Sequence, residues 1–224
     1  MKVDFAAKEL TVKLLYYGPA LSGKTANLRA IHGLGASSAC GDLMTLETRN
    51  DRTLFFDMLP ITIDGANGLK VRLKLFTVPG QVMHEATRRL MLQAADGVAF
   101  IADSQRRAAA ANRESFLNLK QNLEGNGMDP ERMPIIIQFN KRDLEDVRTD
   151  QELESIAEHS REPIYRAVAT RGFGVMQTLL GLIHAASTRL EEEHGLCENL
   201  GIDVTSFVRD VEAKLWQETG SAPR

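Results

Sequence analysis

The stretch that decides the fold is Val12-Lys13-Leu14-Leu15-Tyr16-Tyr17-Gly18-Pro19-Ala20-Leu21-Ser22-Gly23-Lys24-Thr25. Its first six residues predict a strand, and the residues from Lys24 to Leu34 predict a helix. Between them, Gly18 to Thr25 matches the pattern GxxxxGK[ST]. In this pattern, glycines let backbone N–H groups close around phosphate oxygens at a helix N-terminus. The sequence therefore predicts a phosphate-binding loop; the plainer alternative is a Gly-rich turn that only caps a helix.

The side chains of this loop predict a nucleotide site that also holds Mg²⁺. The lysine of the pattern reaches the β- and γ-phosphates, and the hydroxyl that follows it supplies an oxygen to the metal. The residues expected to bind nucleotide here are Gly18, Ala20, Leu21, Ser22, Gly23, Lys24, Thr25 and Ala26, and Thr25 is also the expected metal ligand.

Short apolar runs alternate with helical patterns along the rest of the chain. Further strands are predicted at Leu59–Ile63, Leu69–Val78, Val98–Ala102 and Pro134–Phe139, and further helices at Ala108–Leu123 and Phe173–Arg189. Such alternation predicts an α/β fold, a mostly parallel sheet with helices on both faces. The turn signal Asp64–Gly68 joins the first two of these strands, so one antiparallel edge is expected.

The segment after Arg189 differs in character, and we expect a domain at 1–189 followed by a helical extension at 190–224. An apolar stripe runs along the final helix, made of Val204, Phe207, Val208, Val211 and Leu215. That stripe either docks on the domain's own surface or binds a partner in a groove.

A second motif, Asn140-Lys141-Arg142-Asp143, follows directly after a predicted buried strand. Ligands of open α/β sheets bind at this end of parallel strands. The Asp143 carboxylate can accept two hydrogen bonds from guanine N1–H and N2–H₂, a donor pair that adenine lacks. Asn140 can bond the other edge of the base, and the Lys141 stem can lie against the ring. Together with the phosphate loop, the motif predicts a guanine nucleotide, GTP or GDP; an ATPase or kinase would require Asp143 to be accidental.

Composition and charge exclude several classes of protein. The 224 residues are 43% hydrophobic and 25% charged, as in ordinary globular proteins, and the net charge of −3 gives no support for nucleic acid as a partner. The two cysteines are far apart, so a reduced cytoplasmic compartment is the simplest interpretation. Residues 1–13 lack the apolar core of a signal peptide, and no apolar run approaches bilayer length. We expect no direct insertion into a membrane.

The two motifs in this order resemble the Ras-like small GTPases, and more closely the bacterial MglA-type branch, which helps set cell polarity during gliding motility. The resemblance covers about residues 9 to 189 and is carried by Tyr16–Pro19, Asp51–Asp57, Thr77–Gln81, Ala102–Gln105 and Asn140–Asp143. It implies a P-loop Ras-like G domain with a mostly parallel six-stranded sheet. It also implies slow GTP hydrolysis, a roadblock-domain (MglB-like) activating protein, and effectors in polarity or motility.

The same resemblance implies roles for residues outside the two motifs. Gln81 would orient the attacking water, and Arg52 would act with Lys24 to offset charge on the transferring phosphoryl group. Thr53 would ligate Mg²⁺ when γ-phosphate is present, and the Gly80 N–H would sense that phosphate. The list is completed by Ala169, whose backbone N–H matches the family's last guanine contact. Thr77 stands where Ras-like proteins carry the acid that helps hold Mg²⁺, a departure shared with the MglA-type branch.

Three of these residues also have plain structural interpretations. Arg52 can be a surface arginine paired with Asp51, Gln81 can start a helix, and Thr53 can open an apolar run. Ala20 stands where the family usually has glycine, close to where the γ-phosphate reacts. A methyl group there can crowd the transition state and leave binding intact. The leading hypothesis is therefore a GTPase switch, and the alternative is a nucleotide-loaded scaffold that barely hydrolyses GTP.

Overall fold

The computed structural model describes residues 2–4, 8–47, 55–64, 68, 70–80, 85–201 and 203–215. Its strands are β1 (Lys2–Asp4), β2 (Glu9–Tyr17), β3 (Met44–Glu47), β4 (Phe55–Asp64), β5 (Lys70–Thr77), β6 (Gly97–Asp103), β7 (Ile135–Asn140) and β8 (Ile164–Arg166). Its helices are α1 (Lys24–Leu34), α2 (Glu85–Leu92), α3 (Ala109–Gly125), α4 (Asp150–His159), α5 (Val175–His194), α6 (Leu196–Leu200) and α7 (Val204–Leu215), with 3₁₀ turns η3 (Arg106–Ala108) and η4 (Ala169–Arg171).

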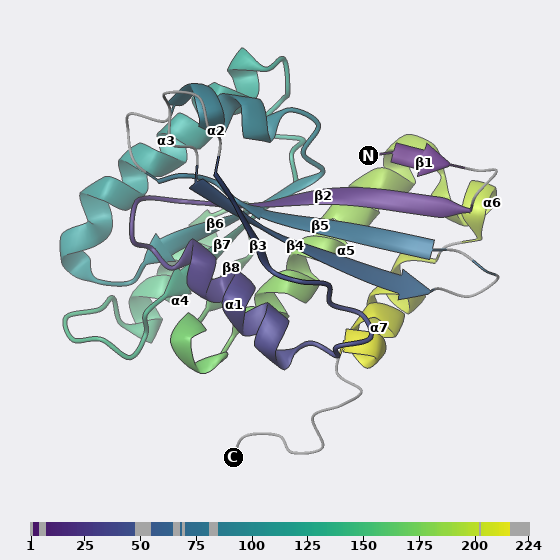
Figure 1. The fold of residues 1–224 in the computed structure, drawn as a ribbon. Coiled ribbons are helices and arrows are strands. Elements are labelled where there is room, and N and C mark those ends of the chain that lie inside the picture. Colours follow the sequence, from purple (N-terminus) through teal and green to yellow (C-terminus); the bar gives the residue numbers. More distant parts are fainter. Residues whose placement is uncertain are drawn as a thin grey trace.

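A single sheet runs through the middle of the molecule in the order β3-β4-β5-β2-β6-β7-β8, and β1 pairs with β2 (Figure 1). Strand β2 is central and pairs in parallel with both β5 and β6. Parallel pairing continues through β7 to β8, whereas β3, β4 and β5 form antiparallel pairs. The expected α/β class, with a mostly parallel sheet and one antiparallel edge, is confirmed.

Helices cover both faces of this sheet because its inner strands are apolar on both sides. Along β2, Leu14 and Tyr16 belong to one core, while Leu15 and Tyr17 belong to the other. The first core is closed by α1, α5 and α7, and the second by α2, α3 and α4 (Figure 1). The polar ends of the parallel strands are thereby left as the open edge at which a ligand site can form.

Among the described residues the sheet has eight strands, two more than the six that were expected. The short strands β1, β3 and β8, of three or four residues, had no predicted run of their own. Runs of three or four residues are too short to show the alternation of apolar and polar residues that identifies a strand. Such strands form by pairing with longer neighbouring strands. The helix expected at 173–189 extends to His194 and crosses the predicted domain boundary at 189, and the division of the chain there stays a prediction.

The apolar stripe of the final helix docks on the protein's own surface. Phe207, Val211 and Leu215 of α7 are buried in the same core as α5. The Ala36 N–H donates to the Leu215 carbonyl at 3.0 Å, and Lys214 Nζ donates to the Asp64 carbonyl. Of the two alternatives left open for this stripe, self-docking is the one observed.

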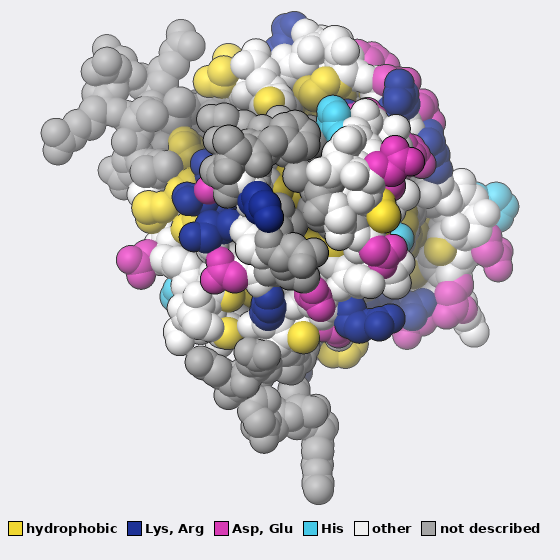
Figure 2. All heavy atoms as spheres, turned by 90° about the vertical axis from the view of Figure 1, so that its right-hand side faces the viewer, with side chains coloured by type: hydrophobic (Ala, Val, Ile, Leu, Met, Phe, Trp, Pro, Cys, Tyr) yellow, Lys and Arg dark blue, Asp and Glu magenta, His cyan; other side chains and the backbone are white. Residues whose placement is uncertain are grey.

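The opposite side of α7 is polar, with exposed Thr205, Ser206, Arg209, Asp210 and Glu212. Figure 2 shows the side of the molecule on which β1, α6 and α7 lie, and basic and acidic side chains are interspersed over it. None of the helices in the described part of the chain is both long enough and apolar enough to span a bilayer.

If α7 belongs to the core, truncating its inward residues should destabilise the whole protein. Phe207→Ala removes a buried ring and should lower the free energy of unfolding by about 3–5 kcal/mol. Arg209→Ala, on the exposed side of the same helix, should change it by less than about 0.5 kcal/mol. Urea denaturation measures both. Equal midpoints for the two variants would mean that α7 adds nothing to the stability of the domain.

Candidate functional site

The loop between β2 and α1 folds around glycines that no other residue could replace. Gly18 and Gly23 have φ angles of 145° and 102°. A Cβ on Gly18 would lie 2.3 Å from the Ile101 carbonyl oxygen, and one on Gly23 would lie 2.2 Å from Asn140 Nδ2. The loop thus presses against the ends of β6 and β7, and α1 begins directly behind it with its N-terminus at the loop.

The Lys24 side chain folds back on this loop and binds its backbone. Its ammonium group donates to the carbonyl oxygens of Gly18 at 2.9 Å and Pro19 at 2.6 Å. The side chain is buried, and burial, together with the nearby positive charge of Arg88, lowers its pKa to about 8. A cation held in this way is poised to exchange neutral carbonyl partners for anionic phosphate oxygens, which are stronger acceptors.

A buried carboxylate that the sequence analysis did not single out lies beside Thr25. Asp57 Oδ2 accepts hydrogen bonds from Thr25 Oγ1 at 2.6 Å and Thr77 Oγ1 at 3.1 Å. Its other oxygen accepts from Thr45 Oγ1 at 2.9 Å, and its backbone N–H donates to Thr77 Oγ1. Antiparallel pairing of β4 with β5 brings Asp57 next to Thr77. Thr77 stands where Ras-like proteins carry an acid, and here the carboxylate beside that position is Asp57 of the neighbouring strand β4.

The sequence contains Asp57 within a quoted run, but no local pattern marks it. Its importance depends on the register of β4 against β5, where Met58 pairs with Phe76. An aspartate inside an apolar strand is the one signal that could have found it, because a buried carboxylate needs partners.

The base motif joins the phosphate loop to the loop before α5. Asn140 Nδ2 donates to the Ser22 carbonyl at 2.9 Å, and Asn140 Oδ1 accepts from the Ala169 N–H at 2.9 Å. The two motifs, 116 positions apart in sequence between Lys24 and Asn140, therefore meet in space. In this arrangement the Ala169 N–H is engaged by Asn140, so the guanine contact implied for it requires that bond to be exchanged.

Lys141 and Asp143 of the base motif each lie near an oppositely charged side chain, at a short distance for Lys141 and a long one for Asp143. Lys141 takes a left-handed backbone with a φ of 64°, and its ammonium group lies 2.7 Å from Asp103 Oδ2. The Asp143 carboxylate is partly exposed and lies 3.7 Å from the Arg171 guanidinium. Asp103 thus fixes the Lys141 stem, while Asp143 keeps acceptor capacity for a ligand.

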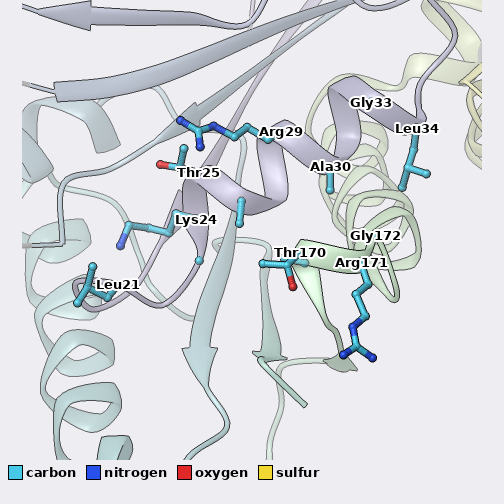
Figure 3. A pocket seen from close by; sticks show the side chains of 13 residues that line it. Leu21, Lys24, Thr25, Arg29, Ala30, Gly33, Leu34, Thr170, Arg171 and Gly172 are labelled. Atoms are coloured by element: carbon cyan, nitrogen blue, oxygen red, sulfur yellow. The ribbon is translucent and has the colours of Figure 1, made fainter. Parts of the chain in front are cut away.

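A cavity of about 760 Å³ opens between the phosphate loop, α1 and η4 (Figure 3). In the close-up, the Lys24 side chain extends toward Leu21, while Ala30 of α1 faces the segment of Thr170 and Arg171. Ala169, Gly23, Thr25 and Ala26 also line it. The cavity therefore runs from the phosphate loop to the loop before α5 (residues 167–174, called the base loop below), while Asn140, Lys141 and Asp143 are not among its lining residues. Its volume falls in the range of small-molecule sites.

Gly80 lies against the phosphate loop. A Cβ on Gly80 would lie 2.5 Å from the Ala20 nitrogen and 2.6 Å from the Pro19 carbonyl carbon, so only glycine fits there. The exposed Ala20 and Leu21 form the outer part of the loop, and Leu21 has a φ of 61°. The remaining predicted residues, Arg52, Thr53 and Gln81, lie outside the described residues.

The fold and this site define a class of protein: a small Ras-like GTPase, with a phosphate loop, a guanine-type motif and a glycine in contact with the loop. No family model matches the chain. The chain is 43% identical over 190 residues to the mutual gliding-motility protein MglA of Myxococcus xanthus (strain DK1622), which covers 85% of this chain and 97% of that protein. The chain belongs to the MglA family of bacterial small GTPases.

The lowered pKa of Lys24 predicts that GDP binding takes up a proton above pH 8. A bound diphosphate favours the ammonium form and raises the pKa, so the contribution of Lys24 to affinity is complete well below pH 8 and is lost as the pH rises through 8. At pH 8.5, calorimetric titrations in two buffers of different ionisation enthalpy should report net uptake of a fraction of a proton per GDP.

Lys24→Arg is the matched control, because a guanidinium stays charged in this range and should show no uptake. A wild-type protein that binds GDP at pH 8.5 without taking up a proton would mean that Lys24 is already fully charged before the ligand arrives.

Proposed function

We propose that this protein is a switch that hydrolyses GTP to GDP and phosphate through the residues of the loop between β2 and α1. The observation that best supports this is the buried Lys24 ammonium on the loop carbonyls, next to a base loop tied in by Asn140. Lys24 binds the β- and γ-phosphates in exchange for Gly18 and Pro19, while Asp143 selects guanine.

Gly80 transmits the state of the nucleotide. It lies on the Pro19–Ala20 peptide with no room for a side chain. Because Lys24 donates to the Pro19 carbonyl of that same peptide, a γ-phosphate that draws Lys24 away from Pro19 also affects the peptide that Gly80 contacts. The chain continues from Gly80 directly into Gln81, which orients the attacking water, and Arg52 offsets the developing charge. Loss of the γ-phosphate releases these contacts, as in other GTPase switches.

The oxygen groups beside Lys24 fit Mg²⁺. Among the described residues, no cluster of three or more His, Cys, Asp and Glu side chains could hold a metal ion. A hydroxyl and a carboxylate 2.6 Å apart, Thr25 and Asp57, are instead the kind of oxygen ligands that Mg²⁺ combines with phosphates. Thr53 would be a further ligand in the GTP state. When bound, the ion would offset the negative charge of the phosphates.

The process controlled by this switch is cell polarity or motility, with a roadblock-domain activating protein that accelerates hydrolysis. The relative from Myxococcus xanthus is named for gliding motility, which supports this assignment. Ala20 also supports a need for activation, because its methyl stands on the loop against which Gly80 packs and can crowd the reacting phosphate.

Purified protein should hydrolyse GTP, but not ATP, in a single-turnover assay. Gln81→Leu should lower the rate by about a hundredfold or more by leaving the water unpositioned, and Arg52→Ala should lower it by about a thousandfold in the presence of an activating protein. Ala20→Gly should raise the intrinsic rate. Dissociation of GDP, measured in parallel, should stay within about twofold for Gln81→Leu.

GTP that remains intact in the wild-type protein but is hydrolysed by Ala20→Gly would favour the scaffold alternative for the native chain. Intact GTP in both would leave two alternatives, a scaffold that does not hydrolyse GTP or a GTPase that depends wholly on a partner.

Asp57 should supply the metal-linked carboxylate that Thr77 does not. Asp57→Asn keeps the size of the side chain but removes its charge, so about 10–100 times more Mg²⁺ should be needed to retain GDP. The readout is the rate of GDP release as Mg²⁺ is chelated, which does not depend on turnover. Asp57→Asn/Thr77→Asp should restore retention, since it returns a carboxylate to the same pair of strands. If Asp57→Asn has the wild-type requirement for Mg²⁺, Asp57 is a purely structural residue.

A further inference from the structure

Three buried polar side chains form a continuous hydrogen-bond chain beneath the site. They are Asn27 of α1, Gln138 of β7 and Thr178 of α5, and each is fully shielded from solvent. Each is an isolated polar residue in an apolar setting; Gln138, for example, interrupts the run Ile135–Phe139. Three buried polar groups cost free energy unless every one of them is hydrogen-bonded. We call this chain the amide relay.

The relay is complete from one end to the other. Asn27 Nδ2 donates to the Gly23 carbonyl at 3.0 Å and to Gln138 Oε1 at 2.9 Å. Gln138 Nε2 donates to Asn27 Oδ1 at 2.9 Å and to Thr178 Oγ1 at 2.8 Å. The Thr178 hydroxyl donates to the Gly174 carbonyl at 2.7 Å. Every side-chain hydrogen in the relay is used, and because both ends are carbonyl acceptors the orientation of each amide is fixed.

The two ends of the relay are equivalent positions of two helices. Gly23 is the N-cap of α1 and Gly174 is the N-cap of α5, and both are left-handed. Each carbonyl accepts the backbone N–H of the residue four positions on, and also that residue's side chain. The relay therefore holds the starting points of two helices, one behind the phosphate loop and one behind the base loop.

The middle of the relay lies next to the base motif. Gln138 and Asn140 are two residues apart on β7, so their side chains share one face of the sheet. Asn140 links Ser22 to Ala169, and Gln138, through Asn27 and Thr178, links Gly23 to Gly174. Two parallel bridges thus connect the same two loops, one at the site and one beneath it.

We propose that the amide relay is a positioning device that fixes the separation of the phosphate and base loops and thereby sets how long the protein retains a guanine nucleotide. The inference rests on the proposed nucleotide site. Asn27, Gln138 and Thr178 act through Gly23 and Gly174, not by touching the ligand. A fully satisfied polar network specifies one geometry, whereas an apolar core of equal stability permits small shifts of the two helices.

Thr178 offers the sharpest test, because two substitutions separate its hydroxyl from its shape. Thr178→Val keeps the volume but removes both the hydrogen bond to the Gly174 carbonyl and the one from Gln138 Nε2. It should speed the release of a fluorescent GDP analogue about tenfold. Thr178→Ser keeps the hydroxyl and should stay within about twofold of wild type. Release is measured by stopped-flow displacement with excess GDP, and the denaturation midpoint is measured alongside.

A paired apolar variant distinguishes positioning from stability. Asn27→Leu/Gln138→Leu removes both amides together, so it should unfold at close to the wild-type denaturant concentration yet release GDP at least about tenfold faster. Asn122→Leu is the control: it removes a buried amide of α3 that bonds to Tyr17, and it should lower the midpoint without changing release.

The proposal would be overturned if Thr178→Val and the paired variant both released GDP at the wild-type rate. It would also be overturned if the rate of GDP release rose in proportion to the loss of stability in all variants, Asn122→Leu included. A wild-type protein that binds no GDP would overturn the proposed function and the relay's role together. If the wild-type protein retains GDP and Thr178→Val releases it faster, both the proposed function and the role of the relay are supported.

Discussion

The close approach of Gly23 to Asn140 is the constraint on which the rest of the site depends. A Cβ on Gly23 would lie 2.2 Å from Asn140 Nδ2, so the phosphate loop rests directly on the end of β7. This contact fixes where α1 begins relative to β7, because Gly23 is the N-cap of α1. It also brings the Ser22 carbonyl within hydrogen-bond distance of the Asn140 amide. The φ of 102° requires glycine at position 23, and any side chain there would also displace the Asn140 amide from its place.

Charge in the site is distributed over strands that are neighbours in space and distant in sequence. Lys24 brings the positive charge on α1, and Asp57 brings the negative charge from β4. The hydroxyls of Thr25, Thr45 and Thr77 surround the carboxylate and satisfy it without a cation. A carboxylate held in this way is already desolvated and oriented, so little rearrangement is needed when a cation comes to share it.

The amino-acid sequence predicted most of the frame and both motifs. The long runs at β2, β5, β6 and β7 and the strand-to-helix pattern at Gly18–Thr25 have local signatures, and parallel strands bring their ends to one edge. Asp57 could not be assigned in this way, because its role follows from the register of a hairpin. The amide relay was equally hidden: Asn27 and Gln138 are 111 positions apart, and each is a lone polar residue on an apolar face. The short edge strands were missed because three or four residues carry no period.

The docking of α7 has a practical consequence for attaching tags to this protein. Its last residue, Leu215, accepts a hydrogen bond from the Ala36 N–H, two positions beyond Leu34, which lines the nucleotide cavity. A fluorescent protein or purification tag fused directly after Leu215, in place of residues 216–224, would therefore begin close to the end of α1 that lines that cavity, where its bulk can interfere with nucleotide exchange. The N-terminal strand β1 pairs with the first half of β2, away from the strand ends that hold the ligand. Fusion at the N-terminus is accordingly a better choice than fusion at Leu215 for following this switch in cells.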